Sequence, residues 1–222
     1  MIRTTLKMLV RTALAVTALV AAGTLLTPVR TVGALDGAAA PAVDHEAWLT
    51  ALTGTHRQLF DSPAPSGGIM LVHIMNYFDT YNKAYQVPDS DIEAIGTFYG
   101  ATTFHGLNDA MWAKYGLGEF LAGIGQDVAP SKVNPWRAAP QVLGMSLPQA
   151  SIESLQGRGA TFILCNNALQ IFSGLLAQQR GLDPKAVYED MKANILPGVA
   201  LVPAMVIAIE KAQEAGFTYQ RQ

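Results

Sequence analysis

Short apolar runs alternate with segments of helical periodicity along most of the chain. The runs contain few polar positions, as expected for strands that are buried on both faces of a parallel sheet. The predicted strands are Gly68–His73, Ile92–Gly100, Ala160–Cys165, Gly198–Pro203 and Phe217–Gln220.

The segments between these runs place apolar residues three and four positions apart, which is the spacing of an amphipathic helix. The predicted helices are Ile74–Gln86, His105–Leu121 with a break near Gly116, Pro148–Gly159, Asn166–Gly181, Asp183–Ile195 and Ala204–Gly216. Strands that alternate with helices predict an α/β fold whose parallel sheet is covered on both faces. Residues 122–147, which contain three prolines, are expected to be irregular and to form a surface loop or a lid.

The first 34 residues have the three-part pattern of a secretory signal peptide. Three basic residues precede an apolar, uncharged stretch from Thr12 to Val29, and small residues follow at Val32 and Ala34. Cleavage after Ala34 would give a periplasmic or secreted protein. An uncleaved membrane anchor is the alternative, because the uncharged stretch is just long enough to span a bilayer.

After this leader, residues 35–67 read as an irregular lead-in and residues 68–222 as one α/β domain. The leader holds four of the fifteen basic residues and none of the seventeen acids, so the remaining chain carries a formal charge of −6. No basic cluster interrupts this acidic balance, which argues against nucleic-acid binding.

Common cofactor and metal motifs are absent from the sequence. There is no dinucleotide-binding glycine motif, no P-loop, no H-E-x-x-H and no G-x-S-x-G. The four histidines (His45, His56, His73 and His105) lack metal-ligand spacing and are expected to be solvated or hydrogen-bonded. No cofactor and no metal are therefore predicted.

Cys165 is the chain's single cysteine, so no internal disulfide can form. It ends the predicted strand Ala160–Cys165, and the next helix begins beside it. In open parallel sheets, ligands bind at the carboxyl ends of the strands, and a helix N-terminus favours an anion such as a thiolate. Asn166 and Asn167 can cap that helix or donate hydrogen bonds to a sulfur anion. A buried, inert cysteine is the alternative.

The end of the predicted strand Ile92–Gly100 lies at the same edge of a parallel sheet. Tyr99 and Gly100 are placed there, and a glycine lets the backbone approach a ligand closely. Tyr99 and Gly100 are therefore expected to line a pocket next to Cys165.

Most of the chain after the leader, from about His56 to Tyr219, resembles the DsrE-like sulfur-relay family. The most specific segments are "LPQASIESLQGRGATFILCNNAL" around Cys165 and the closing "GVALVPAMVIAIEKAQEAGFTY". The resemblance implies a three-layer sandwich with a mainly parallel five-stranded sheet, and homo-oligomers that are commonly trimers or hexamers. It also implies that Cys165 carries sulfur as a persulfide, exchanged with donor or acceptor proteins.

One position departs from the family, because Tyr99 stands where relatives often have a histidine. The competing hypothesis is a non-catalytic binding or structural module in which Cys165 is inert. In that case Tyr77, Tyr81, Tyr85 and Trp112 would supply an oligomer or partner surface, or would pack against the sheet.

Overall fold

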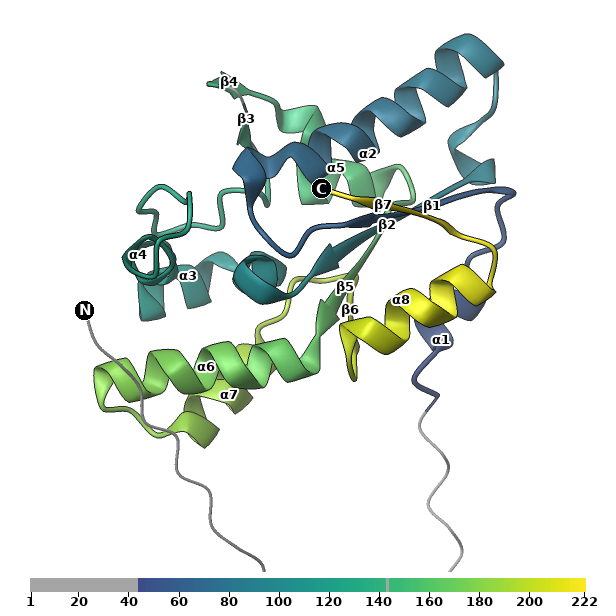
Figure 1. The fold of residues 1–222 in the computed structure, drawn as a ribbon. Helices are drawn as coiled ribbons and strands as arrows, with labels where there is room; N and C mark the ends of the chain where they lie inside the picture. Colours follow the sequence, from purple (N-terminus) through teal and green to yellow (C-terminus); the bar gives the residue numbers. More distant parts are fainter. Residues whose placement is uncertain (1–43, 143) are drawn as a thin grey trace, which may run out of the picture. The chain divides into compact units, whose positions relative to one another are not determined.

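The structure, a computed structural model, describes residues 44–142 and 144–222, so the predicted leader lies outside the described residues. Its main sheet is parallel throughout, with the strand order β6-β5-β2-β1-β7 (Figure 1). The strands are β1 (His56–Asp61), β2 (Ile92–Phe98), β5 (Thr161–Cys165), β6 (Val199–Val202) and β7 (Thr218–Arg221). The predicted α/β fold with a five-stranded parallel sheet is confirmed.

Helices cover both faces of this sheet, which makes three layers. Successive side chains of a strand point to opposite faces. Phe60, Phe98 and Phe162 belong to a core that includes α2 (Ile69–Thr80) and α5 (Ile152–Gly157). Leu59, Ile95 and Ile163 belong to the opposite core, with α8 (Met205–Glu214) and the short α1 (Ala47–Thr50). Figure 1 shows α2 and α5 on one side of the sheet and α8 on the other.

The remaining helices follow the predicted periodicity, whereas a small hairpin was not predicted. These elements are α3 (Asp109–Tyr115), α4 (Leu117–Gly123), α6 (Asn166–Arg180), α7 (Pro184–Ala193) and the hairpin of β3 (Gln141–Val142) and β4 (Met145–Ser146). Gly116 separates α3 from α4 with a φ of 49°, so the predicted helix break is confirmed. Residues 124–140 contain no helix or strand, but the predicted irregular segment 122–147 is not irregular throughout, because it also holds the end of α4 and the hairpin of β3 and β4.

Two predictions for the start of the domain are wrong. Residues 35–67 are not an irregular lead-in throughout, because β1 lies within them and pairs with both β2 and β7. Gly68–His73 is not a strand, because α2 begins at Ile69. The α/β domain therefore begins before Gly68, in agreement with the single unit formed by Val43–Gln222.

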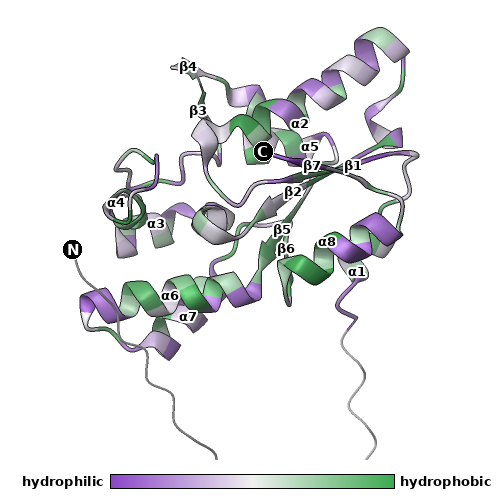
Figure 2. Cartoon of the chain, viewed as in Figure 1, coloured by the Kyte–Doolittle hydropathy of each residue, from purple (hydrophilic) through white to green (hydrophobic). Residues whose placement is uncertain are grey.

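The hydropathy of the strands depends on their place in the sheet. In Figure 2, β5 and β6 are coloured hydrophobic, whereas β7 at the sheet edge is hydrophilic and all four of its residues are exposed. Trp112 is fully buried, whereas Tyr77 and Tyr81 are half-buried against the core and line a surface hollow with the exposed Tyr85. None of the helices in the described part of the chain is both long and apolar enough to cross a membrane.

Candidate functional site

Cys165 is the last residue of β5 and the N-cap of α6. Its sulfur accepts a hydrogen bond from the Ala168 N–H at 3.4 Å, in the first turn of α6. It also accepts one from the Met205 N–H at 3.3 Å, where α8 begins. Two helix N-termini from different parts of the chain thus meet at one sulfur atom. Backbone N–H groups and the positive helix ends both stabilise negative charge at that sulfur.

An open, largely apolar pocket of about 280 Å³ lies over Cys165. Tyr99, Gly100, Ile171 and Val206 contribute to its walls. The cysteine itself is only 5% exposed. Cys165 therefore forms part of the pocket wall, although very little of the residue is accessible to solvent.

The two asparagines after the cysteine have different positions. Asn167 is exposed and lines the pocket. Asn166 is half-buried and does not line the pocket. Its side-chain oxygen instead accepts a hydrogen bond of 2.7 Å from the hydroxyl of Tyr188 on α7. Asn166 therefore links α6 to α7, and the expectation that it would face the ligand is not met in this structure.

Tyr99 follows β2, and its position is fixed by a buried carboxylate. The Tyr99 hydroxyl donates to Asp61 Oδ2 at 3.0 Å, and the Tyr219 hydroxyl donates to the same oxygen at 2.6 Å. The other oxygen of Asp61 accepts from Thr97 at 3.1 Å. Burial, together with the negative charge and hydrogen bond of Asp61, raises the pKa of Tyr99 well above its usual range. Tyr99 is therefore neutral near pH 7 and donates a hydrogen bond to the carboxylate.

Asp61 is the functional-site residue that sequence reasoning did not find. It ends β1, is 1% exposed, and lies at the same carboxyl edge of the sheet as Tyr99 and Cys165. A buried carboxylate is rare unless it is paired or hydrogen-bonded, and the three hydroxyl donors satisfy that need here. The available signal was its position in "LFDSP", after an apolar pair, but that segment was assigned to the lead-in.

Gly100 follows Tyr99 and also lines the Cys165 pocket, and its backbone conformation requires a glycine. Its φ is +57°, and a Cβ atom placed on it would lie 2.7 Å from the Pro63 carbonyl oxygen. The neighbouring Ala101 N–H donates to that same oxygen at 2.9 Å. This close approach of two chain segments brings the loop after β1 next to the end of β2, beside the Cys165 pocket.

Metal chemistry has no visible basis in the described residues. Across 44–142 and 144–222, no group of three or more His, Cys, Asp or Glu side chains is arranged to hold a metal ion. The chemistry available at the site is that of one thiol, two converging N–H donors and a hydrogen-bonded tyrosine.

The comparisons with known proteins add little to this geometry. No family model matches the chain, and a search of curated proteins finds no relative. One similar solved structure is a protein of unknown function, MTH1491, from Methanobacterium thermoautotrophicum. It is 17% identical, covers 76% of this chain and 100% of its own, and superposes with a TM-score of 0.35. A likeness this weak carries no argument, so the site has to be interpreted from its own residues.

Proposed function

We propose that this chain is an exported, DsrE-like protein that binds or transfers sulfur through a persulfide on Cys165. The observation that carries the proposal is the pair of backbone N–H groups, from Ala168 and Met205, that both reach the Cys165 sulfur. The thiolate is the nucleophile in sulfur exchange, and donors of this kind stabilise it.

The proposed step is a sulfur exchange with a persulfide donor. The Cys165 thiolate attacks the terminal sulfur of R–S–SH, and a new S–S bond forms at Cys165. The S–S bond of the donor breaks, and R–S⁻ leaves with the electron pair. No oxidant is consumed, because one persulfide is replaced by another. Return of the sulfur to an acceptor thiolate reverses the same bonds.

The walls of the Cys165 pocket would surround the sulfur atom that the persulfide adds. A persulfide adds one sulfur atom beyond Sγ, and the pocket of about 280 Å³ over Cys165 has room for it. Tyr99 and Gly100 would border the added sulfur, and the amide of Asn167 would offer a donor at the pocket wall. Asp61 acts only through Tyr99, as a residue that positions the ring.

The partners of such a carrier would be a sulfur donor protein and a sulfur acceptor protein, in the periplasm or outside the cell. We also propose a homo-oligomer, a trimer or hexamer, as the resemblance implies. Ile171 and Val206, which line the Cys165 pocket, are 60% and 72% exposed. A partner that docks at the cysteine would therefore cover apolar side chains.

The second candidate is a non-catalytic binding or structural module. The low exposure of Cys165, 5%, favours this reading, because a thiol without access to solvent does not exchange sulfur. In that case the same apolar side chains would form a contact surface with no chemistry beneath it.

Alkylation kinetics separate the two candidates. The folded protein is treated with a small, uncharged thiol alkylator, and the modified fraction is followed by intact mass against the urea-denatured protein. The sulfur-carrier proposal predicts complete modification of the native protein without unfolding. Modification that proceeds only at the rate of global unfolding would support the inert module instead.

A further inference from the structure

A second cavity, which shares no lining residue with the Cys165 pocket, is lined in part by a buried histidine whose second ring nitrogen has no hydrogen-bond partner. His105 is fully buried in the 3-10 turn Gly100–Gly106. Its Nε2 is the one buried side-chain nitrogen or oxygen without a hydrogen-bond partner among the described residues. Such atoms are uncommon in folded proteins, because an unpaired buried polar group costs about 1–3 kcal/mol.

The hydrogen-bond partner of Nδ1 determines the tautomer of the ring, and therefore whether Nε2 donates or accepts a hydrogen bond. Nδ1 lies 3.3 Å from the backbone carbonyl oxygen of Thr102, which can only accept a hydrogen bond. Burial lowers the pKa of His105 to about 3, so the ring is neutral near pH 7 and carries one proton. That proton is on Nδ1, and Nε2 therefore presents a lone pair. Nε2 can accept a hydrogen bond from a ligand but cannot donate one.

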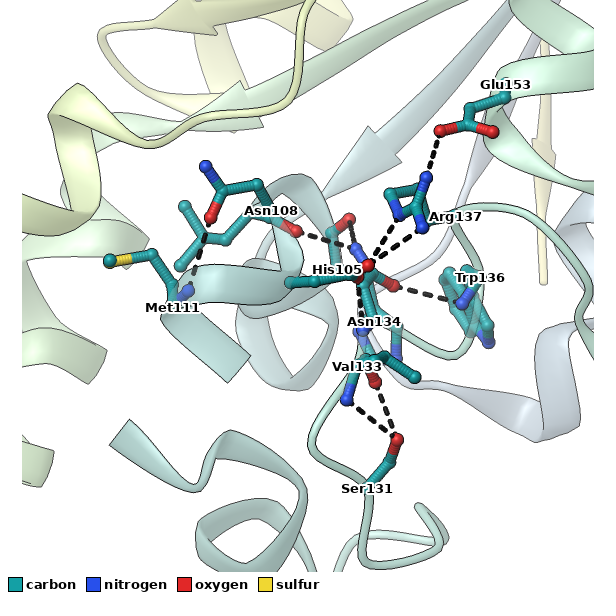
Figure 3. Close-up of polar contacts among 11 residues, drawn as sticks. His105, Asn108, Met111, Ser131, Val133, Asn134, Trp136, Arg137 and Glu153 are labelled. Atoms are coloured by element: carbon teal, nitrogen blue, oxygen red, sulfur yellow. Dashed lines mark hydrogen bonds and ion pairs between the residues drawn. The ribbon is translucent and has the colours of Figure 1, made fainter. Parts of the chain in front are cut away.

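The ring is held rigidly by its neighbours. Trp136 lies against it with ring centroids 3.9 Å apart, and Trp112 contacts it edge-on at 5.3 Å. Asn134 fixes the Trp136 segment, as Figure 3 shows. Its amide nitrogen donates to the His105 carbonyl at 2.7 Å, and its oxygen accepts from the Trp136 N–H at 3.0 Å.

Charged side chains anchor the same segment from outside (Figure 3). Arg137 donates to Asp109 at 3.0 Å and pairs with Glu153. The Asn134 N–H also donates to Asp109, at 2.9 Å. Although residues 124–140 contain no helix or strand, the part around Trp136 is thus tied to α3 and α5. The wall it forms is preorganised.

His105 and Trp136 line a cavity of about 380 Å³ between the start of α2 and the segment 127–141. This volume is within the range of small-molecule sites. Its walls include Val128, Pro130 and Pro135, with Asp127 as the charged side chain and no Lys or Arg. The cavity shares no lining residue with the Cys165 pocket.

We propose that this cavity binds a small organic ligand that donates an O–H or N–H hydrogen bond from an apolar body to His105 Nε2. The lone pair selects a donor, and the indole and proline walls favour the apolar body. An amine and an alcohol share this chemistry. Asp127, the one charged side chain of the lining, favours the amine in its ammonium form, in which the indole ring of Trp136 adds a cation–π attraction.

The test uses probes that differ in their hydrogen-bond donor. The full chain is titrated with 1-pentanol, n-butylammonium and methyl butyl ether, which has a similar apolar body but no donor. Binding is measured by calorimetry and by the ¹⁵N resonance of His105 Nε2. The proposal predicts that one or both donor probes bind and shift this resonance, and that the ether does neither. The probe that binds more tightly shows whether the charge contributes.

Two variants and one matched control complete the test. His105→Phe keeps the stacked ring but removes the lone pair, and should weaken the binding of the donor probes about tenfold. Ala139→Leu adds bulk to a cavity-lining residue and leaves His105 intact, and should also weaken binding. Ala138→Leu, at an exposed neighbour outside the lining, should not.

Three results would overturn the proposal. They are equal binding of the ether, unchanged affinity in both His105→Phe and Ala139→Leu, or no binding of any probe. In the last case water alone satisfies Nε2. Because the two pockets share no residue, none of these results bears on Cys165 chemistry.

Discussion

At the scale of single residues, Asp61 explains how the Cys165 pocket keeps its shape. Its carboxylate accepts hydrogen bonds from three hydroxyl groups that come from β2, the turn after β2 and β7. Hydrogen bonds to a charged group are worth about 1.5–3 kcal/mol each. The three donors are far from Asp61 in the sequence, so no local pattern could have predicted the cluster. Cys165, in contrast, was identifiable because its signal is local.

The Tyr99–Asp61 hydrogen bond makes a testable contribution to stability. Tyr99→Phe removes one donor from a buried carboxylate and should lower the free energy of unfolding by about 1–2 kcal/mol in urea titrations. Tyr219→Phe is the control, because its ring is 41% exposed although it binds the same oxygen. Water can replace that hydroxyl, so the loss there should be under about 1 kcal/mol. If both variants lost the same free energy of unfolding, the greater burial of Tyr99 would not be what makes its hydrogen bond more costly to remove.

His105 should make the stability depend on pH. Its pKa is lowered by burial to about 3 in the folded protein, against an ordinary value near 6.5 in the unfolded chain. Between these values the unfolded chain binds a proton that the folded protein does not. The contribution of neutral His105 to the free energy of unfolding is therefore fully present above about pH 6.5. It is lost as the pH falls towards 3, by up to about 1.4 kcal/mol per pH unit.

The difference between wild type and His105→Phe isolates this contribution, because the carboxylates titrate in both. Urea titrations at pH 7, 5 and 4 should show the wild type losing more stability than the variant on acidification. Parallel loss in both proteins would mean that His105 does not resist protonation in the fold.

At the scale of elements, the sequence pattern was sufficient where helices and strands are long or uniformly apolar. β2, β5, β6, α6, α7 and α8 lie where the pattern predicts them. β1 was missed because His56, Arg57 and Gln58 are polar and half-buried, and only its second half is buried. Gly68–His73 was assigned to a strand because a short apolar run has the same appearance in a buried helix.

The turn after β2 should not tolerate a side chain at Gly100. Gly100→Ala places a methyl group 2.7 Å from the Pro63 oxygen at a φ of +57°, and should cost about 2 kcal/mol or more. Gly174→Ala is the matched control, because it lies inside α6 with open space around its Cβ position. It should be neutral or stabilising by up to about 1 kcal/mol. Thermal unfolding of both variants measures the contrast, and a Gly100→Ala protein as stable as wild type would contradict the turn geometry.

At the scale of the whole domain, the parallel sheet places the carboxyl ends of all five strands at one edge. The sequence pattern predicted this edge and the residues Tyr99, Gly100 and Cys165 on it. It could not predict the exposure of the cysteine, which depends on how α8 packs against β5. Met205, at the start of α8, supplies the second N–H donor from a position 40 residues away.

The proposed homo-oligomer can be tested on the apolar side chains beside the pocket. Val206 and Ile207 are neighbours on α8 and are 72% and 51% exposed, so together they form an apolar patch that a second copy could cover. Sedimentation should show an oligomer that Val206→Asp dissociates. Val133→Asp, at a 53% exposed valine in the irregular segment, should leave it intact. A monomer at all concentrations would contradict this proposal.

Intact mass spectrometry measures directly whether sulfur is transferred to Cys165. The purified protein is incubated with a small-molecule persulfide donor, desalted and weighed, with Cys165→Ser as the control. We expect a product one sulfur atom heavier, reversed by a reducing thiol and absent from Cys165→Ser. A wild-type protein of unchanged mass, under conditions in which the denatured chain gains the sulfur atom, would contradict the proposed transfer.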